Sequence, residues 1–560
     1  MAILKPLSWV PDYSKNKLKG DFFAGLTVGV LLIPQSMAYA LIAGLPVIYG
    51  LYASLVPQVI YALFGSSKRL SVGPTAMDSL LIASGLGLLA AIGSQEYIEL
   101  AIILSLLVGV IQTLLGFMKM GFITQLLSKP IISGFTSAAA ILIGLNQLGP
   151  LLGMNMNKGN FIVLLTSILN NLIHLDLLTT LIGLVSIISL FALKRWIPKI
   201  PGTLIIVLTS IGLVHYFELH LSNLKIIGEI PMGLPSFSIP HLNLEKMMLL
   251  LPLAFTLAVI SFIESFSVGK NLDMQSKDHS LNANTELVAL GSANFIGAFF
   301  MSFPVTGGFG RSAVNFIAGA RTPFSGVISA CLIAITLLFF TDIFAFLPYT
   351  VLAAIILVAL GSLIDFKYPY ELWETNFHDF FMLMFTLLVT LICGMIWGIS
   401  SGMSLYVLTL LYKSIFPKVQ VKPFDEKIEA LPVPSRASET ALHHNLYILK
   451  IDTPLITINI ESIEQQINQQ MINSNPDSQV LLIDLSTIQH IDGRGIKGIK
   501  RLILQLNEKN IRILWYAIRP SLYASFTTKK LIAGPMGEHI FKDSIAAINF
   551  LKEEDERQKL

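Results

Sequence analysis

The sequence has few charged residues. Only 13% of its 560 residues are Asp, Glu, Lys or Arg, against roughly 25% in an ordinary soluble domain. The deficit is uneven: no charged residue occurs from Phe22 to Ser67, and similar charge-poor runs recur as far as Tyr412. This composition excludes a wholly soluble globular protein and indicates many membrane-spanning helices.

Other features are scarce or absent. Cys331 and Cys393, the two cysteines, both lie in apolar runs, which argues against a disulfide framework or a cysteine zinc site. We therefore expect no metal site and no cofactor. No G-x-x-x-x-G-K-[ST] loop occurs, so neither an ATP motor of that kind nor an enzyme is expected. A net charge of +3 gives no sign of a nucleic-acid partner.

The N-terminal segment, residues 1–20, is polar and basic up to Lys19, and we expect no cleavable signal peptide there. Residues 21–415 are expected to form an all-helical membrane domain of about fourteen spans. Lys and Arg gather in the loops after even-numbered spans, as in Lys68 and Arg69, which predicts an even number of spans and two cytoplasmic termini. A bacterial inner (plasma) membrane is the expected location.

The membrane domain divides into two halves, about 21–220 and 246–415, with seven expected spans each. Both halves have an interrupted third span: residues 71–78 and residues 306–312 are Gly/Pro-rich and each leads into a short apolar helix. Paired interruptions of this kind indicate a transporter's substrate site at the bilayer midplane. Because each half has an odd number of spans, we expect the halves to be inverted relative to each other.

Two half-helices that begin near the midplane would present unpaired N–H groups and the positive ends of their dipoles, which favours an anion. Arg311, near the start of the second half-helix, would add a full positive charge. The alternative is that Arg311 neutralises a nearby carboxylate and holds the fold.

Two carboxylates stand out in apolar surroundings. Glu264 lies deep in an apolar helix, where it could bind and release a proton during ion coupling, or form a permanent ion pair with Arg311. Asp78 follows Thr75 by three residues and fits a capping box; the alternatives are cation or proton binding, or substrate selectivity.

The first span is interrupted by Pro34, which removes a backbone hydrogen bond and predicts a kink. Gln35 and Tyr39 are four residues apart, so they share one helix face. They could present an amide and an aromatic wall to the site, or simply pack against another helix.

Specific segments resemble the SulP (sulfate permease) family over nearly the whole chain. These segments are Asp21, Ala24, Gly25 and Leu26; Pro34, Gln35 and 37–40; 43–46; 49–52; 70–74; Asn284, Glu286, Leu287 and 289–291; and 307–315. The resemblance implies an inverted seven-plus-seven fold like that of uracil permease, with spans 1–4 and 8–11 as a substrate-carrying core and spans 5–7 and 12–14 as a gate. It also implies elevator-like transport and a homodimer.

By similarity to the family, the anion would lie between the third and tenth half-helices, and Glu264 matches an acid linked to proton coupling. The residues implied near the anion are Gln35, Tyr39, Thr75, Ala76, Gly310, Arg311 and Ser312. Two of the positions depart from the family pattern. Gly310 stands where a Ser is frequent, and Asp78 stands where many members have an apolar residue.

Charges become frequent after Tyr412, and residues 416–444 have the composition of a linker. Residues 445–553 show β-rich runs at 480–485 and 513–516 with a helical pattern between them, which predicts a soluble α/β domain. A charged tail, 554–560, follows.

This domain resembles a STAS domain, shared with anti-sigma-factor antagonists. Arg494 stands where the antagonists have a phosphorylatable Ser, so their phosphoswitch is not expected, and the domain could instead bind a cytoplasmic partner. The signature residues are Asp484, Ser486, Asp492, Arg494 and Gly495.

Taken together, the residues and the resemblance predict a secondary active transporter of small inorganic anions, above all proton-coupled sulfate uptake. The alternatives are a sodium-coupled bicarbonate or dicarboxylate transporter, an anion exchanger or channel, and a membrane sensor that signals through the STAS domain. The expected partners are the anion, a co-transported proton or sodium ion, membrane lipid and a second copy of the chain.

Overall fold

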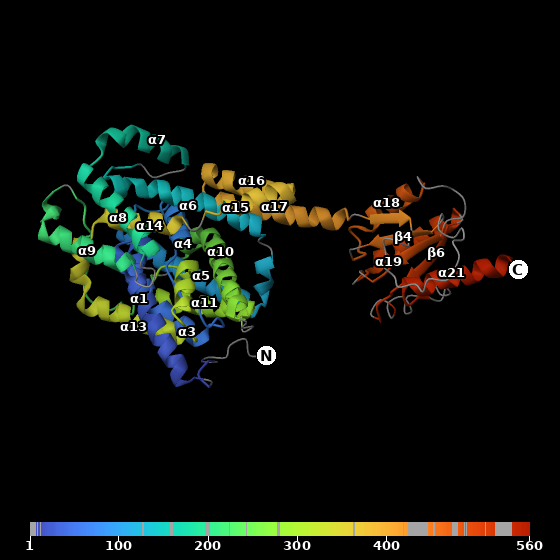
Figure 1. Ribbon diagram of the computed structural model, residues 1–560, viewed down its shortest axis with the longest axis horizontal. Coiled ribbons are helices and arrows are strands. Elements are labelled where there is room, and N and C mark those ends of the chain that lie inside the picture. Colours follow the sequence, from blue (N-terminus) through green and yellow to red (C-terminus); the bar gives the residue numbers. More distant parts are fainter. Residues whose placement is uncertain are drawn as a thin grey trace. The chain divides into compact units, whose positions relative to one another are not determined.

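A computed structural model provides the structure of the protein (Figure 1). The chain divides into two compact units, Met1–Tyr406 and Val407–Leu560, and each is described by itself. The residues that the structure describes are 7, 9–11, 13–125, 128–156, 161–196, 202–222, 224–241, 243–276, 281–361, 364–417, 419–423, 446–451, 454–472, 480–486, 488, 490–509, 511–520, 523 and 540–559. Most of the predicted linker, 416–444, lies outside them.

In the first half of the membrane unit, three helices precede a two-residue strand, and a short helix directly follows it. The second and third of these helices form one apolar segment, Val47–Phe64. The elements of this half are α1 (Lys15–Ile42), α2 (Val47–Ala53), α3 (Val56–Phe64), β1 (Val72–Gly73), α4 (Ala76–Leu86), α5 (Gln95–Phe117), η1 (Met120–Gln125), α6 (Lys129–Leu152), α7 (Phe161–Asn171), η2 (Leu172–His174), α8 (Leu177–Trp196), α9 (Gly202–Tyr216) and η3 (Leu219–Leu221).

The second half repeats this order of helices, strand and short helix. Its elements are α10 (Leu244–Ser276), α11 (Ala283–Ala298), β2 (Thr306–Gly307), α12 (Phe309–Ile317), α13 (Phe324–Phe339), η4 (Thr341–Phe346), α14 (Tyr349–Leu360), α15 (Lys367–Thr375), α16 (Phe377–Cys393) and α17 (Met395–Ile415). The two predicted interruptions are therefore confirmed, each as a strand followed by a short helix.

Strands β1 and β2 pair with each other, with Val72 opposite Gly307 and Gly73 opposite Thr306 in antiparallel register. Equivalent strands of two repeats run antiparallel when one repeat is inverted relative to the other. The pairing therefore brings both interruptions to one place and agrees with the predicted inversion of the halves.

Five described helical segments are long and apolar enough to cross a membrane by themselves, and a pair bent by 118°, Phe161–His174 with Leu177–Leu193, could form a sixth. Several further apolar helices are only 10–17 residues long, as expected where spans are interrupted or short. The total of about fourteen spans stays a prediction. The five segments are Lys15–Ile42, Val47–Phe64, Gln95–Phe117, Lys129–Leu152 and Leu244–Ser276.

The helices of the membrane unit pack in two groups. In one group, α5 packs against α10 and α11, and α11 also packs against α3. In the same group, α1 packs against α2, α12 and α13. In the other group α6 packs on α14 and α16, and α8 packs on α9 and α14. These groups correspond to the core and gate that the resemblance implies.

Glycines set the close approach of α5 and α11. A Cβ atom at Gly109 would lie 2.3 Å from the backbone nitrogen of Phe295, and one at Gly291 would lie 2.6 Å from the backbone nitrogen of Thr113. Small residues of this kind let membrane helices come into backbone contact without a hydrophobic driving force between them.

The C-terminal unit contains, among its described residues, a five-stranded sheet in the order β3-β4-β5-β6-β7. Strand β3 runs antiparallel to β4, and the remaining neighbours are parallel. The predicted strands and intervening helix are confirmed. The elements are β3 (Val419–Pro423), β4 (Leu446–Ile451), α18 (Ile460–Ile472), β5 (Val480–Asp484), α19 (Gly493–Glu508), β6 (Arg512–Tyr516), β7 (Ile540–Phe541) and α21 (Ser544–Lys559), the last of which includes much of the predicted tail.

Asp492 caps α19 and ties it to the loop before α18. Its Oδ1 accepts a hydrogen bond from the Gly495 N–H at 2.8 Å, and its Oδ2 accepts from the N–H and hydroxyl of Thr457, both at 2.7 Å. Glycine is required at 495, because a Cβ there would lie 2.4 Å from the Leu455 carbonyl oxygen. These bonds to the carboxylate, the Gly495 bond above all, lower the pKa of Asp492 to about 2.

The other signature residues lie at the end of β5 and in the first turn of α19. Asp484 ends β5, and its Oδ1 accepts from the Ser486 N–H at 2.8 Å. The Ser486 carbonyl accepts from Arg519 Nε at 2.8 Å. Arg494 is exposed in the first turn of α19.

We predict that Gly109→Val destabilises the membrane unit, because the added side chain meets the backbone of α11 and neither helix can withdraw cheaply. Overpacking of this kind costs about 1–3 kcal/mol or more. The measurement is the temperature at which the detergent-purified protein loses its monodisperse gel-filtration peak. Gly212→Val is the matched control, since a Cβ at Gly212 meets nothing within 4 Å. Equal melting temperatures for the two variants would contradict the prediction.

We predict that Asp492→Ala lowers the stability of α19 by about 0.5–2 kcal/mol through loss of its N-cap. The expected result is faster amide hydrogen exchange in the first turns of α18 and α19 of the full chain at neutral pH, with Asp492→Asn closer to wild type. Because the folded pKa is depressed, this stabilisation is present above the unfolded pKa of about 3.9 and is lost as the pH falls towards 2. Unchanged exchange in the alanine variant would show that the cap does not stabilise the helix.

Candidate functional site

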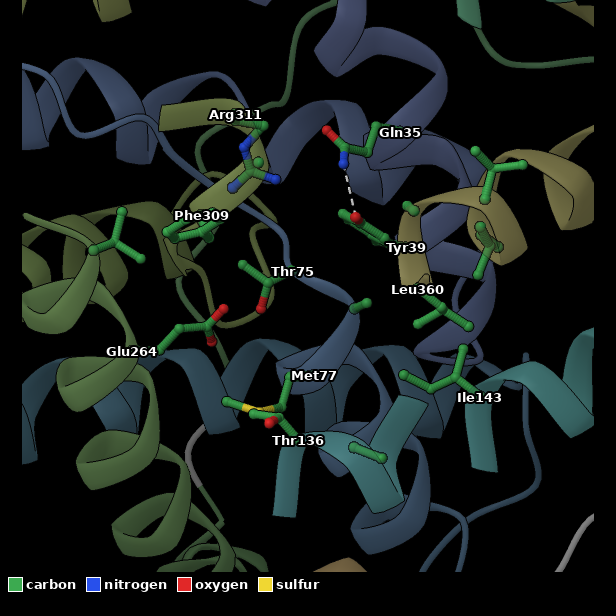
Figure 2. Close-up of a pocket in the computed structure, with 18 of the residues that line it drawn as sticks. Gln35, Tyr39, Thr75, Met77, Thr136, Ile143, Glu264, Phe309, Arg311 and Leu360 are labelled. Atoms are coloured by element: carbon green, nitrogen blue, oxygen red, sulfur yellow. Dashed lines mark hydrogen bonds between the residues drawn. The ribbon is translucent and has the colours of Figure 1, made fainter. Parts of the chain in front are cut away.

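A cavity of about 500 Å³ lies beside the paired interruptions, between the two helix groups. Figure 2 shows Arg311, Gln35, Tyr39, Thr75 and Glu264 around one open space. Six of the seven residues predicted near the anion line this cavity, together with Glu264. The six are Gln35, Tyr39, Thr75, Ala76, Gly310 and Arg311.

Two predicted site residues lie elsewhere. Ser312 is fully buried, and its hydroxyl oxygen accepts a hydrogen bond from the Ser71 N–H at 2.9 Å. It therefore holds the chain at the entrance to β1 and does not line the cavity. Asp78 is also fully buried and does not line the cavity, although the three residues before it, Thr75, Ala76 and Met77, do.

The side chain of Arg311 is only 1% exposed and bridges the two interruptions. One terminal nitrogen donates to the carbonyl of Pro74, and the other donates to the carbonyl of Thr306 at 3.4 Å. Among the described residues Arg311 Nε has no partner. No ion pair with Glu264 or Asp78 forms there, so the predicted alternative of a permanent Arg311 ion pair is not found. The guanidinium keeps its full charge at the cavity wall.

The N-terminus of α4 opens at the cavity. Thr75 is its N-cap, and the Thr75 hydroxyl oxygen accepts from the Asp78 N–H at 3.4 Å, as predicted for a capping box. The reciprocal half of that box is wrong: neither carboxylate oxygen of Asp78 has a hydrogen-bond partner among the described residues. The Asp78 carboxylate therefore does not fold back to accept a hydrogen bond from the helix N-terminus.

The N-terminus of α12 opens at the same cavity. Its N-cap is Gly308, which supplies no side-chain acceptor. A Cβ at Gly308 would lie 3.1 Å from Arg311 Cζ, whereas a Cβ at Gly310 would meet nothing within 4 Å. Gly308 therefore makes room for the guanidinium, and Gly310 leaves open space where the family frequently has a Ser.

Gln35 and Tyr39 share one face of α1, as their spacing predicts. The Gln35 amide nitrogen donates to the Tyr39 hydroxyl at 2.7 Å (Figure 2), and Gln35 Oε1 is buried with no partner among the described residues. The bond orients the tyrosine hydroxyl hydrogen away from Gln35 Nε2, so that it is available to a group in the cavity.

The far wall of the cavity comes from the second helix group, and sequence reasoning did not find it. Its residues are mostly apolar, and no signal in the sequence distinguishes them from other span residues. They include Phe135, Thr136, Ala139 and Ile143 of α6 and Ile355, Ile356 and Leu360 of α14.

A buried amide network supports the second interruption and was also missed. The Asn294 side chain donates to the Val305 carbonyl at 3.1 Å and accepts from the Val305 N–H at 2.8 Å. It also donates to Gln112 Oε1 at 3.1 Å, and Gln112 donates to the Ser261 hydroxyl at 2.9 Å. The sequence signal that would have indicated this network is an amide side chain, Gln112 or Asn294, within an otherwise apolar helix.

The comparisons with known families agree with this geometry. Residues 18–386 match the model of the Sulfate permease family, and residues 437–542 match that of the STAS domain. The first match covers more than half of the 560 residues and includes both interruptions.

Known relatives align over nearly the whole chain. Sulfate transporter 4.1, chloroplastic, of Arabidopsis thaliana is 32% identical over 527 residues, which cover 90% of this chain and 76% of that protein. A probable sulfate transporter of Mycobacterium tuberculosis (strain CDC 1551 / Oshkosh) is 28% identical over 539 residues, which cover 95% of this chain and 96% of that protein.

A solved structure shows the same fold. The murine Solute Carrier 26 family member A9 anion transporter in the inward-facing state superposes with a TM-score of 0.85 over 98% of this chain and 94% of that one, at 24% identity. With the family match over residues 18–386 and the second match near the C-terminus, the chain belongs to the sulfate permease family and carries a STAS domain after its membrane domain.

Proposed function

We propose that this protein is a secondary active transporter that carries a small inorganic anion, sulfate in the first place, across a membrane together with protons. The observation that carries the proposal is one cavity that holds two half-helix N-termini, the Arg311 guanidinium and the Glu264 carboxyl. The first three attract an anion, and the carboxyl can gain and lose a proton beside it.

The relatives support the choice of substrate. The Arabidopsis and mycobacterial proteins are named as sulfate transporters, and the murine structure is that of an anion transporter. Sulfate is compact and presents four acceptor oxygens, so it suits helix ends, the Tyr39 hydroxyl and Arg311.

An elevator-like movement is the proposed means of transport. The anion-facing residues come from α1, α4, α10 and α12, while the apolar far wall comes from α6 and α14. A mostly apolar wall, in which Thr136 has a hydroxyl group, offers the anion few competing ligands, so the first helix group could slide along it with the anion still bound. A homodimer in a plasma membrane with both termini cytoplasmic remains our expectation, although the Arabidopsis relative is described as chloroplastic.

The test of proton coupling is radiolabelled sulfate uptake into proteoliposomes with and without an inward proton gradient. We expect the gradient to stimulate uptake severalfold in the wild type and less in Glu264→Gln, because the amide cannot take up a proton. Glu245→Gln is the matched control, since Glu245 is an exposed carboxylate at the start of the same helix. If well-folded protein takes up no sulfate, sulfate is rejected as the substrate. Uptake of bicarbonate and of dicarboxylates under a sodium gradient would then be tested next.

The role of Arg311 is tested by Arg311→Lys. The ammonium keeps the charge but loses the planar fork that reaches the Pro74 and Thr306 carbonyls. We expect the apparent affinity for sulfate to fall by about tenfold, which corresponds to about 1.4 kcal/mol. The measurement is the KM of uptake at a fixed proton gradient. An unchanged KM would show that the guanidinium holds the fold without contacting the anion.

A further inference from the structure

The carboxyl group of Asp78 is unusual for its place in the membrane unit. It is fully buried in the first turn of α4, and neither oxygen has a hydrogen-bond partner among the described residues. A charged carboxylate in such a place is strongly disfavoured unless something neutralises it. The fold therefore keeps a carboxyl group at a position where it accepts no hydrogen bond from any described residue.

The charges around Asp78 belong to the anion site. Arg311 interacts electrostatically with Asp78, with Glu264 and with Tyr39, and Asp78 in turn interacts with Glu264. Helices α1, α5, α6 and α10 pack against α4. The charged residues of α5 and α6 stand within the first two turns of those helices and are Glu96, Glu99 and Lys129.

One guanidinium thus interacts electrostatically with two carboxyl groups. With both carboxyls ionised, this group of residues has a net charge of minus one, which repels an anion. With both protonated, it has a net charge of plus one, which attracts an anion. We propose that Asp78 is a second proton-binding carboxyl, so that each divalent anion is carried with two protons, one on Glu264 and one on Asp78.

The proposal rests on the proton-coupled anion transport proposed above and adds its stoichiometry. Two protons are taken up with the anion on one side of the membrane and released with it on the other. The empty site with two carboxylates and the loaded site with two carboxylic acids and sulfate both have a net charge of minus one. Because the net charge is the same in both states, binding the anion does not raise the free-energy cost of moving the site through the bilayer.

The geometry favours a proton over a metal cation at Asp78. A hard cation needs several oxygen ligands, whereas a proton needs a single oxygen atom. Asp78 itself does not line the cavity, whereas Thr75, Ala76 and Met77, the three residues before it, do. Of these three, Thr75 has a hydroxyl group, whose oxygen accepts a hydrogen bond from the Asp78 N–H.

The experiment measures accumulation of radiolabelled sulfate at equilibrium in proteoliposomes that contain the full chain. The pH difference is one unit and the membrane potential is held at zero. Each coupled proton sustains roughly tenfold accumulation per pH unit. We expect roughly 100-fold accumulation in the wild type and roughly tenfold in Asp78→Asn and in Glu264→Gln.

A second readout separates coupling from structural damage. Two protons neutralise sulfate, so wild-type accumulation should not respond to an imposed membrane potential. Asp78→Asn carries a net negative charge inward, so an inside-negative potential should lower its accumulation. Ser79→Ala is the matched control, because Ser79 is buried next to Asp78 with no partner for its hydroxyl among the described residues. It should keep the wild-type values.

Three results would overturn the inference. They are roughly tenfold accumulation by the wild type, Asp78→Asn behaving like the wild type, and a sodium gradient replacing the proton gradient. If Asp78→Asn does not fold, the Glu264→Gln variant decides the question. Proton-driven accumulation that remains in this variant supports a second proton-binding site, and complete loss of proton-driven accumulation refutes it. A wild type that takes up sulfate without any response to pH contradicts proton coupling itself, which is a different failure.

Discussion

The pairing of β1 with β2, bridged by Arg311, is the contact on which the rest of the membrane unit depends. Extended backbone at membrane depth is tolerated only where its polar groups are satisfied. Here each strand supplies the other's partner, and the guanidinium binds the carbonyls of Pro74 and Thr306. Because the two short strands lie side by side, the helices that follow them, α4 and α12, both begin at the same cavity.

The support for this pairing lies in polar side chains far from it in sequence. Asn294 of α11 satisfies both backbone groups of Val305, and Gln112 connects Asn294 to Ser261 of α10, one turn before Glu264. The interruption that contains Arg311 and the helix that contains Glu264 are thereby held in one rigid group. Such a group can move as a unit, as the proposed elevator requires, without altering the geometry of the site.

Under the proposed function, charge balance would explain why carboxyl groups lie near Arg311. A site with Arg311 alone would bind an anion regardless of the proton concentration. In the proposed mechanism, Glu264 and Asp78 oppose the anion when ionised and admit it when protonated, which would couple binding to the proton gradient. Their burial strengthens this opposition, because the low dielectric of the interior screens charges far less than water does.

The sequence by itself predicted the membrane class, the two interruptions, the Arg311–Glu264 pair of charges and the α/β domain, because charge depletion, Gly/Pro breaks and residue periodicity are local features of the chain. It placed Ser312 at the anion and folded Asp78 onto its own helix, and it found neither the α6 and α14 wall nor the Asn294 support. These features depend on which helix faces pack against each other, and many apolar helix faces in the chain are similar. Only the tertiary structure decided this, since shape complementarity between distant segments leaves no periodic trace in the sequence.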